Sequence, residues 1–480
     1  MLTLTKYEKA LVALFVITLP LINPWVRGDG VGYYAFARSI LVEHRLDFTQ
    51  DWLRANESFR MGRVDADGQL RPEEYTATGR INNHFSVGPA VLWSPFLVTA
   101  HAGVIVYDHL GGHVPADGFS KPYRVAMALG TATYGFLGLL ISFWLARNYV
   151  AERWAFLATL GIWFASSLPV YMYFNPSWSH AHSAFAVALF VWYWVRTRAG
   201  RTLSQWVILG ALGGLMVNVY YINGVLLLMP LFESVGEYWK ALRSNSAREG
   251  GQLFIKNVLF TITFVVALLP TLLARKVIYG NYFETGYEHL WVWTSPYILK
   301  VCFSADHGLF SWTPILILSL AGMFLGRNDR NLRIFSIVVF AVYVFVIGCY
   351  ESWDGNSSFG NRYFVSLSPL FVLGLAETFD WLGHAWQERR AAILAWGSTA
   401  VLVLWNLGLI FQWGMHLIPD RGPISWREAA VNQVTAVPEQ ATESLRNYFL
   451  HRRELMDRIE QKDVNQIKKS EQSEGTGPTQ

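Results

Sequence analysis

The chain has 480 residues, of which 52% are apolar, 15% are aromatic and only 15% are charged. A soluble globular protein has about 25% charged residues to cover its surface, so this composition argues against a soluble enzyme, a disordered protein and a disulfide scaffold. The formal net charge of +4 is small and dispersed, which argues against a nucleic-acid partner. Long apolar stretches recur along the chain and predict an all-α, polytopic transmembrane helical bundle.

The first predicted element is an apolar run from about Ala10 to Val26. No small-x-small cleavage site follows before Arg27, so we interpret the run as an uncleaved helix rather than a signal peptide. Lys6 and Lys9 flank its start, and the positive-inside rule therefore predicts a cytoplasmic N-terminus. The segment after this helix is then expected on the extracytoplasmic side.

Further apolar runs lie near 87–107, 123–146, 154–173, 181–196, 203–234, 257–279, 306–326, 332–350, 360–381 and 391–415. If every run crossed the membrane once, the arginine clusters Arg147/Arg153 and Arg196–Arg201 would lie outside, against the positive-inside rule.

Two changes remove this conflict. The run 87–107 begins with Gly88-Pro89 and is expected to lie in, or dip into, the outer interface. The run 203–234 is too long for one ordinary span and is expected to break at Asn218–Gly224 into two short helices. About 11 spans result, with the C-terminus extracytoplasmic. The alternative is that one short loop violates the rule.

We expect a transmembrane domain over residues 1–415, with a long first outer segment at 27–122 that holds interfacial helices, and an extracytoplasmic tail over 416–480. Ile424–Arg458 combines mixed charge with scattered apolar positions, which predicts an amphipathic surface helix. Lys462–Gln480 is rich in Lys, Gln, Ser and Gly, which predicts disorder. The two cysteines, Cys302 and Cys349, leave open one bridge or two free thiols.

Unusual polar residues gather on the expected outer face. Ionisable groups at membrane depth are functional candidates, and His180 and Arg362 stand at the starts of apolar runs. No Walker loop, dinucleotide fingerprint, HExxH or CxxC pattern occurs, so no cofactor is predicted. His180 and His182 would face different sides of a helix, so no metal site is predicted at these histidines. A divalent metal stays an open alternative that no motif supports.

Asp29 immediately follows the first helix, in the sequence Arg27-Gly28-Asp29-Gly30. The next stretch, Val31–Leu41, is amphipathic at helical spacing and predicts a short helix lying on the membrane. Asp29 would stand near its start, where the helix dipole favours a carboxylate. It is either an ordinary N-cap or a carboxylate at the mouth of a cavity, placed to take a proton from an acceptor hydroxyl.

An acidic residue directly after the first helix, followed by a Tyr-rich interfacial helix, resembles the GT-C glycosyltransferases, such as the protein O-mannosyltransferases and the lipid A aminoarabinose transferases. Asn83–Leu92 is similar to the family's His/Lys-Pro-Pro stretch, and Ser179–Phe185 and Ser358–Tyr363 are similar to segments of bacterial members. Two departures are Asp29-Gly30, where many relatives have Asp-Glu, and Gly88-Pro89 in place of Pro-Pro.

The resemblance implies transfer of a sugar from a polyprenyl-phosphate donor to a hydroxyl of a glycan, lipid or protein acceptor, with inversion, on the outer face of a bacterial inner membrane. Asp29 would be the general base, with Asp47 or Asp51 in reserve. The side chains expected to bind the donor phosphate are Arg362 first, then His84, Lys300 and His180. The side chains expected to contact the substrates share the same face: Tyr33, Tyr34, Asn83, Asp47, Trp353, Asn361 and Tyr363.

Simpler interpretations of these residues remain open. Arg362 is also a helix-start arginine that can snorkel to the interface, and the histidines can be hydrogen-bonded packing residues. The aromatic side chains can form an interfacial belt. At the level of the whole chain, the alternatives are a transporter or flippase of a lipid-linked or small polar substrate, and a receptor or assembly protein. A transporter favours repeated halves and broken helices near the midplane, whereas this sequence shows no repeat and gathers its polar residues on one face.

Overall fold

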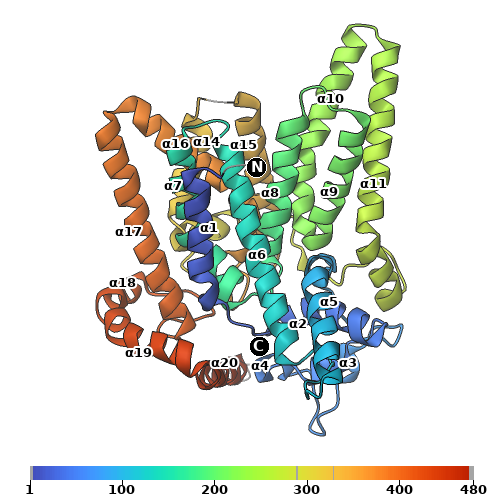
Figure 1. The fold of residues 1–480 in the computed structure, drawn as a ribbon, viewed down its shortest axis with the longest axis vertical. Helices are drawn as coiled ribbons and strands as arrows, with labels where there is room; N and C mark the ends of the chain where they lie inside the picture. The colour runs from blue at the N-terminus through green and yellow to red at the C-terminus, as the bar shows by residue number, and fades with distance from the viewer. Residues whose placement is uncertain (1–3, 288–289, 328, 475–480) are drawn as a thin grey trace.

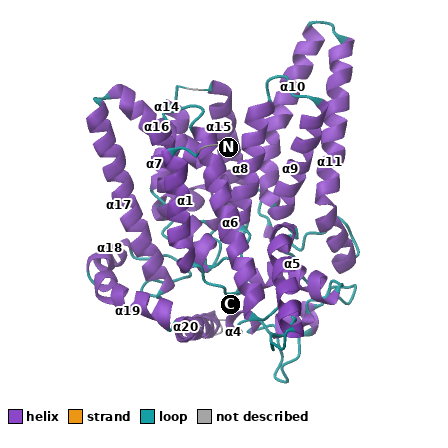
Figure 2. Cartoon of the chain, in the orientation of Figure 1, coloured by secondary structure: helices purple, strands orange, loops and turns teal. Residues whose placement is uncertain are grey.

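The computed structural model describes residues 4–287, 290–327 and 329–474. Within these ranges all regular secondary structure is helical, apart from isolated bridges between single pairs of residues (Figure 2). The predicted all-α class is therefore confirmed.

The larger helices form a bundle that runs between two ends of the molecule (Figure 1). They are α1 (Lys6–Thr18), α6 (Lys121–Ala146), α7 (Glu152–Phe164), α8 (His180–Thr197), α9 (Leu203–Val219), α10 (Leu228–Arg243), α11 (Ala247–Tyr279), α14 (Ile315–Leu325), α15 (Arg330–Gly348), α16 (Ser368–Ala385) and α17 (Glu388–Gly414).

The remaining helices are mostly short and lie toward one end of this bundle. They are α2 (Asp29–Arg38), α3 (Thr49–Leu53), α4 (Glu57–Arg60), α5 (Gly88–His109), α12 (Ile298–Phe303), α13 (Leu309–Trp312), α18 (Trp426–Val434), α19 (Ala436–Leu450) and α20 (Arg452–Glu474).

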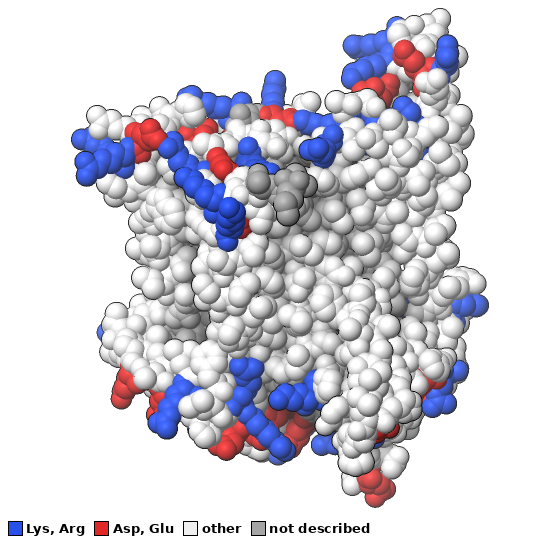
Figure 3. All heavy atoms as spheres, viewed as in Figure 1, with Lys and Arg blue, Asp and Glu red and all other residues white. Residues whose placement is uncertain are grey.

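The protein is a multi-pass membrane protein. Among the described residues, six helical segments are long and apolar enough to cross a membrane: α5, α6, α11, α15, 362–385 and α17. The longest, α11, is apolar, and yet only 11% of its apolar 18-residue stretch is buried inside the protein. This exposure is expected for a helix that faces lipid. Figure 3 shows charged side chains at the two ends of the visible face and an uncharged band between them.

The arginine-rich connections lie together at one end, where the bundle helices α6–α7, α8–α9, α10–α11, α14–α15 and α16–α17 are joined (Figure 1). We call it the arginine-loop end. Arg147 pairs with Glu8 of α1 at 3.0 Å, Arg153 pairs with Glu388, and Arg198 pairs with Asp329. Arg147 therefore lies beside the start of α1, and Arg198 lies at the same end of the bundle, as the revised topology requires. Their cytoplasmic location remains a prediction.

The run 203–234 divides as predicted. Helix α9 ends at Val219, a 3-10 turn covers Tyr221–Leu227, and α10 starts at Leu228. Tyr220 is extended at the break, and the Asn223 side-chain amide donates to the carbonyl of Met216 at 3.0 Å. The same carbonyl also accepts from the backbone N–H of Tyr220 at 3.2 Å, so the Asn223 side chain adds a second hydrogen bond where α9 ends.

The run 87–107 forms α5, which packs against α2, α6 and α9 (Figure 1). Its start lies against the end of α9, because a Cβ added at Gly88 would come within 2.4 Å of backbone atoms of Asn218 and Val219. Glycine is required for this approach of two backbones. The predicted interfacial position of α5 stays a prediction, because its length and hydropathy also suit a membrane span.

Helix α2 is more enclosed than the amphipathic pattern predicted. Its residues Gly30–Arg38 are all buried, including the side expected to face the membrane. The cause is the long segment that follows, which folds back over the helix: Phe48 contacts Phe36, Phe85 contacts Tyr33, and Trp93 contacts Tyr34.

The tail differs from its prediction in two ways. The single amphipathic helix expected over 424–458 is instead three helices, α18, α19 and α20. The disorder predicted from Lys462 is wrong as far as Glu474, where α20 ends, and residues 475–480 lie outside the described part. Composition predicted disorder, but α20 has long-range partners: Glu460 accepts from Asn56 at 2.9 Å, and Asp463 pairs with Arg27. The division of the chain at 415/416 stays a prediction.

Candidate active site

Asp29 and Arg362 form an ion pair, although 333 positions separate them in the chain. Asp29 opens α2 directly after Gly28, whose positive φ of 53° turns the chain into the helix. Arg362 opens the 3-10 turn 362–367 that leads into α16. Its Nη1 donates to Asp29 Oδ2 at 2.6 Å. The N-cap is Gly28, so Asp29 is not an ordinary capping residue.

The guanidinium of Arg362 is held inside the protein. Its side chain is 9% exposed, whereas that of Asp29 is 34% exposed. The guanidinium lies 4.4 Å from the centre of the Trp178 ring and 5.5 Å from that of Tyr363. Its Nε has no hydrogen-bond partner. Arg362 therefore does not snorkel to the membrane surface, and it has a donor left for an anion.

Two cavities meet at this ion pair, with volumes of about 600 Å³ and about 220 Å³. The residues that line both are Asp29, His84, Phe85, Asn356 and Arg362. A group bound between them would lie against a carboxylate and a guanidinium at once.

The larger cavity has a long apolar wall and a charged end. Its apolar wall is built largely by α17, α19 and α20, with Ile410, Phe411 and Met456 among the lining residues. Its charged lining residues are of both signs: Arg27, Asp29, Arg63, Arg362, Asp420, Arg421 and Asp463. We call the part that holds Asp29 and Arg362 its charged end. This division suits an amphipathic molecule with an anionic head group.

The smaller cavity is lined by hydroxyl-bearing aromatic side chains. Its tyrosines are Tyr33, Tyr220, Tyr221, Tyr287, Tyr350 and Tyr363, and His180 also lines it. A tyrosine presents an apolar ring and a polar hydroxyl, which is the pairing that a sugar requires.

The candidate phosphate ligands fall into two groups. Arg362, His84 and His180 line one or both cavities. Desolvation lowers the pKa of His84 to about 4, so its imidazole is neutral at pH 7 and offers an N–H donor rather than a charge. Lys300 lines neither cavity: its side chain is exposed and its ammonium lies 4.9 Å from the centre of the Tyr297 ring.

The candidate substrate contacts are also divided. Tyr33 and Tyr363 line the smaller cavity. Tyr34 does not, because its hydroxyl donates to the carbonyl of Gly118 at 2.6 Å. Asn361 and Trp353 line neither cavity. They stabilise the loop between them, because the Asn361 amide donates to the Trp353 carbonyl at 3.0 Å.

Three further candidates lie outside both cavities. The Asn83 amide donates to the carbonyl of Gly32 at 3.0 Å, so it fixes α2 instead. Asp47 accepts from the backbone and hydroxyl of Thr49, and Asp51 forms a buried pair with Arg38. Asp47 and Asp51, the alternative general bases, are therefore already bonded to other residues of the first outer segment.

Arg275 is a residue that the sequence-based selection missed. Its guanidinium donates to the carbonyls of Asn83, His84 and Phe85 and to the hydroxyl of Tyr221. It therefore holds the loop that carries His84 against the cavities. An arginine within the apolar run 257–279 is an ionisable group at membrane depth, and that signal was present in the sequence.

Asn356 was expected on the loop that carries Arg362, but not as a residue of the site itself. It lines both cavities from a loop in which Gly355 and Asn356 have positive φ angles of 78° and 57°. The Gly355-Asn356 pair fits a turn that needs left-handed backbone, but the pattern does not reveal where the turn points.

Two groups of described residues bring metal-ligating atoms close together: Asp306, His307 and Asp354, and His416, Asp420 and Asp463. In the second group Asp463 already pairs with Arg27 and with His416, whose Nε2 lies 2.8 Å from Asp463 Oδ1. Its charges are therefore largely balanced by the protein.

No protein-family model matches the chain, and no curated protein sequence does. Among solved structures, ArnT from Cupriavidus metallidurans bound to undecaprenyl phosphate is 13% identical, with a TM-score of 0.44 over 84% of this chain and 70% of that chain. The apo state of the same protein is also 13% identical with a TM-score of 0.44, over 89% of this chain and 73% of that chain.

Proposed function

We propose that the protein is a membrane glycosyltransferase that moves a hexosyl or pentosyl group from a polyprenyl-phosphate donor to an acceptor hydroxyl. The observation that carries this proposal is the Asp29–Arg362 pair at the junction of two cavities. It combines a partly exposed carboxylate, which can accept a proton, with a buried guanidinium, which can hold a phosphate.

The larger cavity is the proposed place of the donor lipid. Its apolar wall suits polyprenyl units, and its charged end suits the phosphate. The smaller cavity, with its tyrosine lining, is the proposed place of the sugar. The donor would then lie with its phosphate at Arg362 and its anomeric carbon near Asp29.

The Asp29–Arg362 pair also suggests how the reaction starts. In the absence of donor the two side chains neutralise each other. An arriving phosphate competes for the guanidinium, and Asp29 then becomes available to the acceptor hydroxyl.

Transfer follows in one displacement. Asp29 takes the proton of the acceptor hydroxyl, whose oxygen attacks the anomeric carbon from the side opposite to the phosphate. The bond between that carbon and the phosphate oxygen breaks with inversion. The negative charge that develops on the lipid phosphate is stabilised by Arg362 and by the neutral His84 as a hydrogen-bond donor. The reaction as proposed uses only the donor, the acceptor and side chains of this chain.

We call the end that carries α2 and the two cavities the site end. It is the proposed extracytoplasmic face, and the arginine-loop end is the proposed cytoplasmic face, of a bacterial inner membrane. With about 11 spans, the N-terminus is then cytoplasmic and the C-terminus extracytoplasmic. The acceptor is a glycan, lipid or protein that reaches the site from outside.

A structure of the protein in lipid nanodiscs with undecaprenyl phosphate tests the proposal. We expect phosphate density within hydrogen-bond distance of the Arg362 guanidinium, and lipid-chain density along α17 in the larger cavity. Phosphate density away from both Asp29 and Arg362 would overturn the proposed roles. A lipid bound within the middle of the bundle, between the two ends, would support the transporter or flippase instead.

A further inference from the structure

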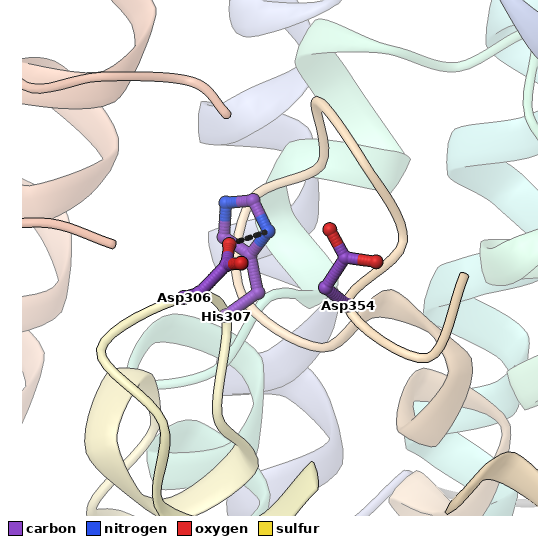
Figure 4. Close-up of side chains that lie close together, drawn as sticks. All are labelled: Asp306, His307 and Asp354. Carbon is purple, nitrogen blue, oxygen red and sulfur yellow. Dashed lines mark ion pairs between the residues drawn. The ribbon is translucent and has the colours of Figure 1, made fainter. Parts of the chain in front are cut away.

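A second polar cluster lies outside the residues that line the two cavities. Asp306 and His307 come from the connection between α12 and α13, and Asp354 comes from the loop that follows α15 (Figure 4). Their candidate ligand atoms all lie within 4.8 Å of one another, and His307 Nδ1 is 3.6 Å from Asp306 Oδ1.

His307 is buried without a hydrogen-bond partner. Its side chain is 0% exposed, and neither ring nitrogen has a hydrogen-bond partner. Oδ1 of Asp306 also lacks one. Buried polar atoms are almost always paired, so an imidazole and a carboxylate oxygen without hydrogen-bond partners, in a group whose candidate ligand atoms lie within 4.8 Å, indicate a missing partner. Figure 4 shows the imidazole and the Asp306 carboxylate side by side, with the Asp354 carboxylate next to them.

The missing partner has to be positive. Two carboxylates and one imidazole carry an excess of negative charge. The cations of the chain that act on the cluster electrostatically are Lys300 and Arg362, and Arg362 is already paired with Asp29. The structure gives no ion pair between Lys300 and Asp306, because the ammonium lies over the ring of Tyr297 instead. A cation from solution is therefore the partner that the cluster lacks.

We propose that Asp306, His307 and Asp354 bind a divalent transition-metal ion, with Zn²⁺ as the preferred cation. Imidazole nitrogen together with carboxylate oxygen is a donor set that zinc favours, whereas Mg²⁺ and Ca²⁺ favour oxygen alone. Zinc ligands at about 2.1 Å in a tetrahedron lie about 3.4 Å apart. His307 Nδ1 and Asp306 Oδ1 are 3.6 Å apart, close to that spacing. Water is the proposed fourth ligand.

The ion would join two loops at the edge of the candidate active site. The first is anchored, because the carbonyl of Ala305 accepts from the indole of Trp312 at 3.0 Å. The second begins at Asp354 and continues through Asn356 to Arg362, both of which line the cavities. The metal ligands are therefore positioning residues for Arg362. This role rests on the proposed function, whereas metal binding itself does not.

The test uses the full-length protein in detergent, stripped with EDTA, desalted and then mixed with Zn²⁺, Mn²⁺ or Mg²⁺. Bound metal is measured by inductively coupled plasma mass spectrometry, and the thermal midpoint is followed in parallel. We expect one zinc per chain, a higher thermal midpoint with zinc, and weaker binding of manganese and then magnesium.

Two variants locate the ion. His307→Phe keeps a ring of similar size and removes both nitrogens, and Asp354→Asn keeps the shape of the side chain. Each should weaken zinc binding by at least about 100-fold and abolish the zinc-dependent rise in midpoint. His416→Asn, in the other cluster, is the matched control and should keep wild-type binding.

Wild-type protein that binds no zinc, or that binds magnesium as tightly as zinc, would overturn the site. So would full zinc binding in both variants, or loss of zinc confined to His416→Asn. If His307→Phe does not fold, zinc binding by Asp354→Asn alone tests whether this cluster holds the ion. Failure of zinc binding leaves the binding of undecaprenyl phosphate at Arg362 untouched, so the two proposals fail separately.

Discussion

The two ends of the molecule use charge differently. At the arginine-loop end the ion pairs range from exposed to buried: Arg153 and Glu388 have side chains 46% and 67% exposed, whereas Arg201, paired with Glu233, is 2% exposed. At the site end, Arg362 and Arg275 are buried. Exposed pairs contribute little to stability, whereas a buried charge needs well-placed partners. The two ends therefore differ at the cavities, because Arg362 lines both of them and Arg153 and Arg201 line neither.

The largest expected difference between the ends is accessibility. A thiol-reactive probe that cannot cross the membrane, added to cells, should label Asp67→Cys at the site end and leave Ser204→Cys at the arginine-loop end unlabelled. Both positions are exposed, and the native Cys302 and Cys349 are buried, so background labelling is low. Labelling at position 204 but not at 67 would reverse the proposed topology.

Asp29→Asn should reduce the transfer rate by roughly 10²–10⁴-fold, because it removes the proton acceptor at nearly constant shape. The measurement is turnover with the true donor, together with the thermal midpoint. Glu388→Gln, at the other end, is the matched control and should keep the wild-type rate. Near-native turnover in Asp29→Asn would show that the carboxylate only pairs with Arg362.

Arg275→Met should lower the free energy of unfolding by roughly 1.5–3 kcal/mol, the contribution of charge-assisted hydrogen bonds that are left without a donor. The lost partners are the carbonyls of Asn83, His84 and Phe85. The thermal midpoint in detergent is the measurement. A midpoint equal to wild type would mean that water replaces the guanidinium at these carbonyls.

Arg362→Ala should weaken the affinity for donor lipid by about one to two decades, and Arg362→Lys should recover only part of the loss, because lysine lacks the planar fork. Affinity and thermal midpoint are measured for both variants. Unchanged affinity in Arg362→Ala would move the phosphate site toward His84. Full recovery by lysine would show that charge alone is recognised.

The smallest effect is expected at the exposed pair. Arg153→Ala should change stability by about 0.2–1 kcal/mol and leave donor affinity unchanged. The same thermal and binding assays apply. A loss as large as that of Arg275→Met would mean that the two ends do not differ in the way their charges are used.

The fold followed from the sequence because its main determinants are local. Apolar runs and arginine-rich loops predicted the bundle and the break at Asn218–Gly224, which the Asn223 side chain explains. Asp29 and Arg362 were found as candidates because each stands at the edge of an apolar run. Their direct contact was beyond prediction, because it depends on how segments 333 positions apart pack together.

Side-chain direction and long-range partners set the limit of prediction. Tyr33 and Tyr34 are neighbours in α2, yet only Tyr33 lines the smaller cavity, since the hydroxyl of Tyr34 is bound to Gly118. Lys300 has the right charge but is exposed. The order of α20 depends on contacts of Glu460 and Asp463 with residues more than 400 positions earlier, which composition does not record.

The wall of the larger cavity joins early and late parts of the chain. Leu21 and Asn23 line it together with Tyr448 and Asp463, and the hydroxyl of Tyr448 donates to the carbonyl of Leu21 at 2.6 Å. A ribosome delivers these segments in order, and early parts of a chain fold before late parts are made. The larger cavity, which we propose for the donor lipid, is therefore enclosed only when the stretch through Asp463 has been synthesised. A nascent chain interrupted before that point has Asp29 but lacks the late part of the wall.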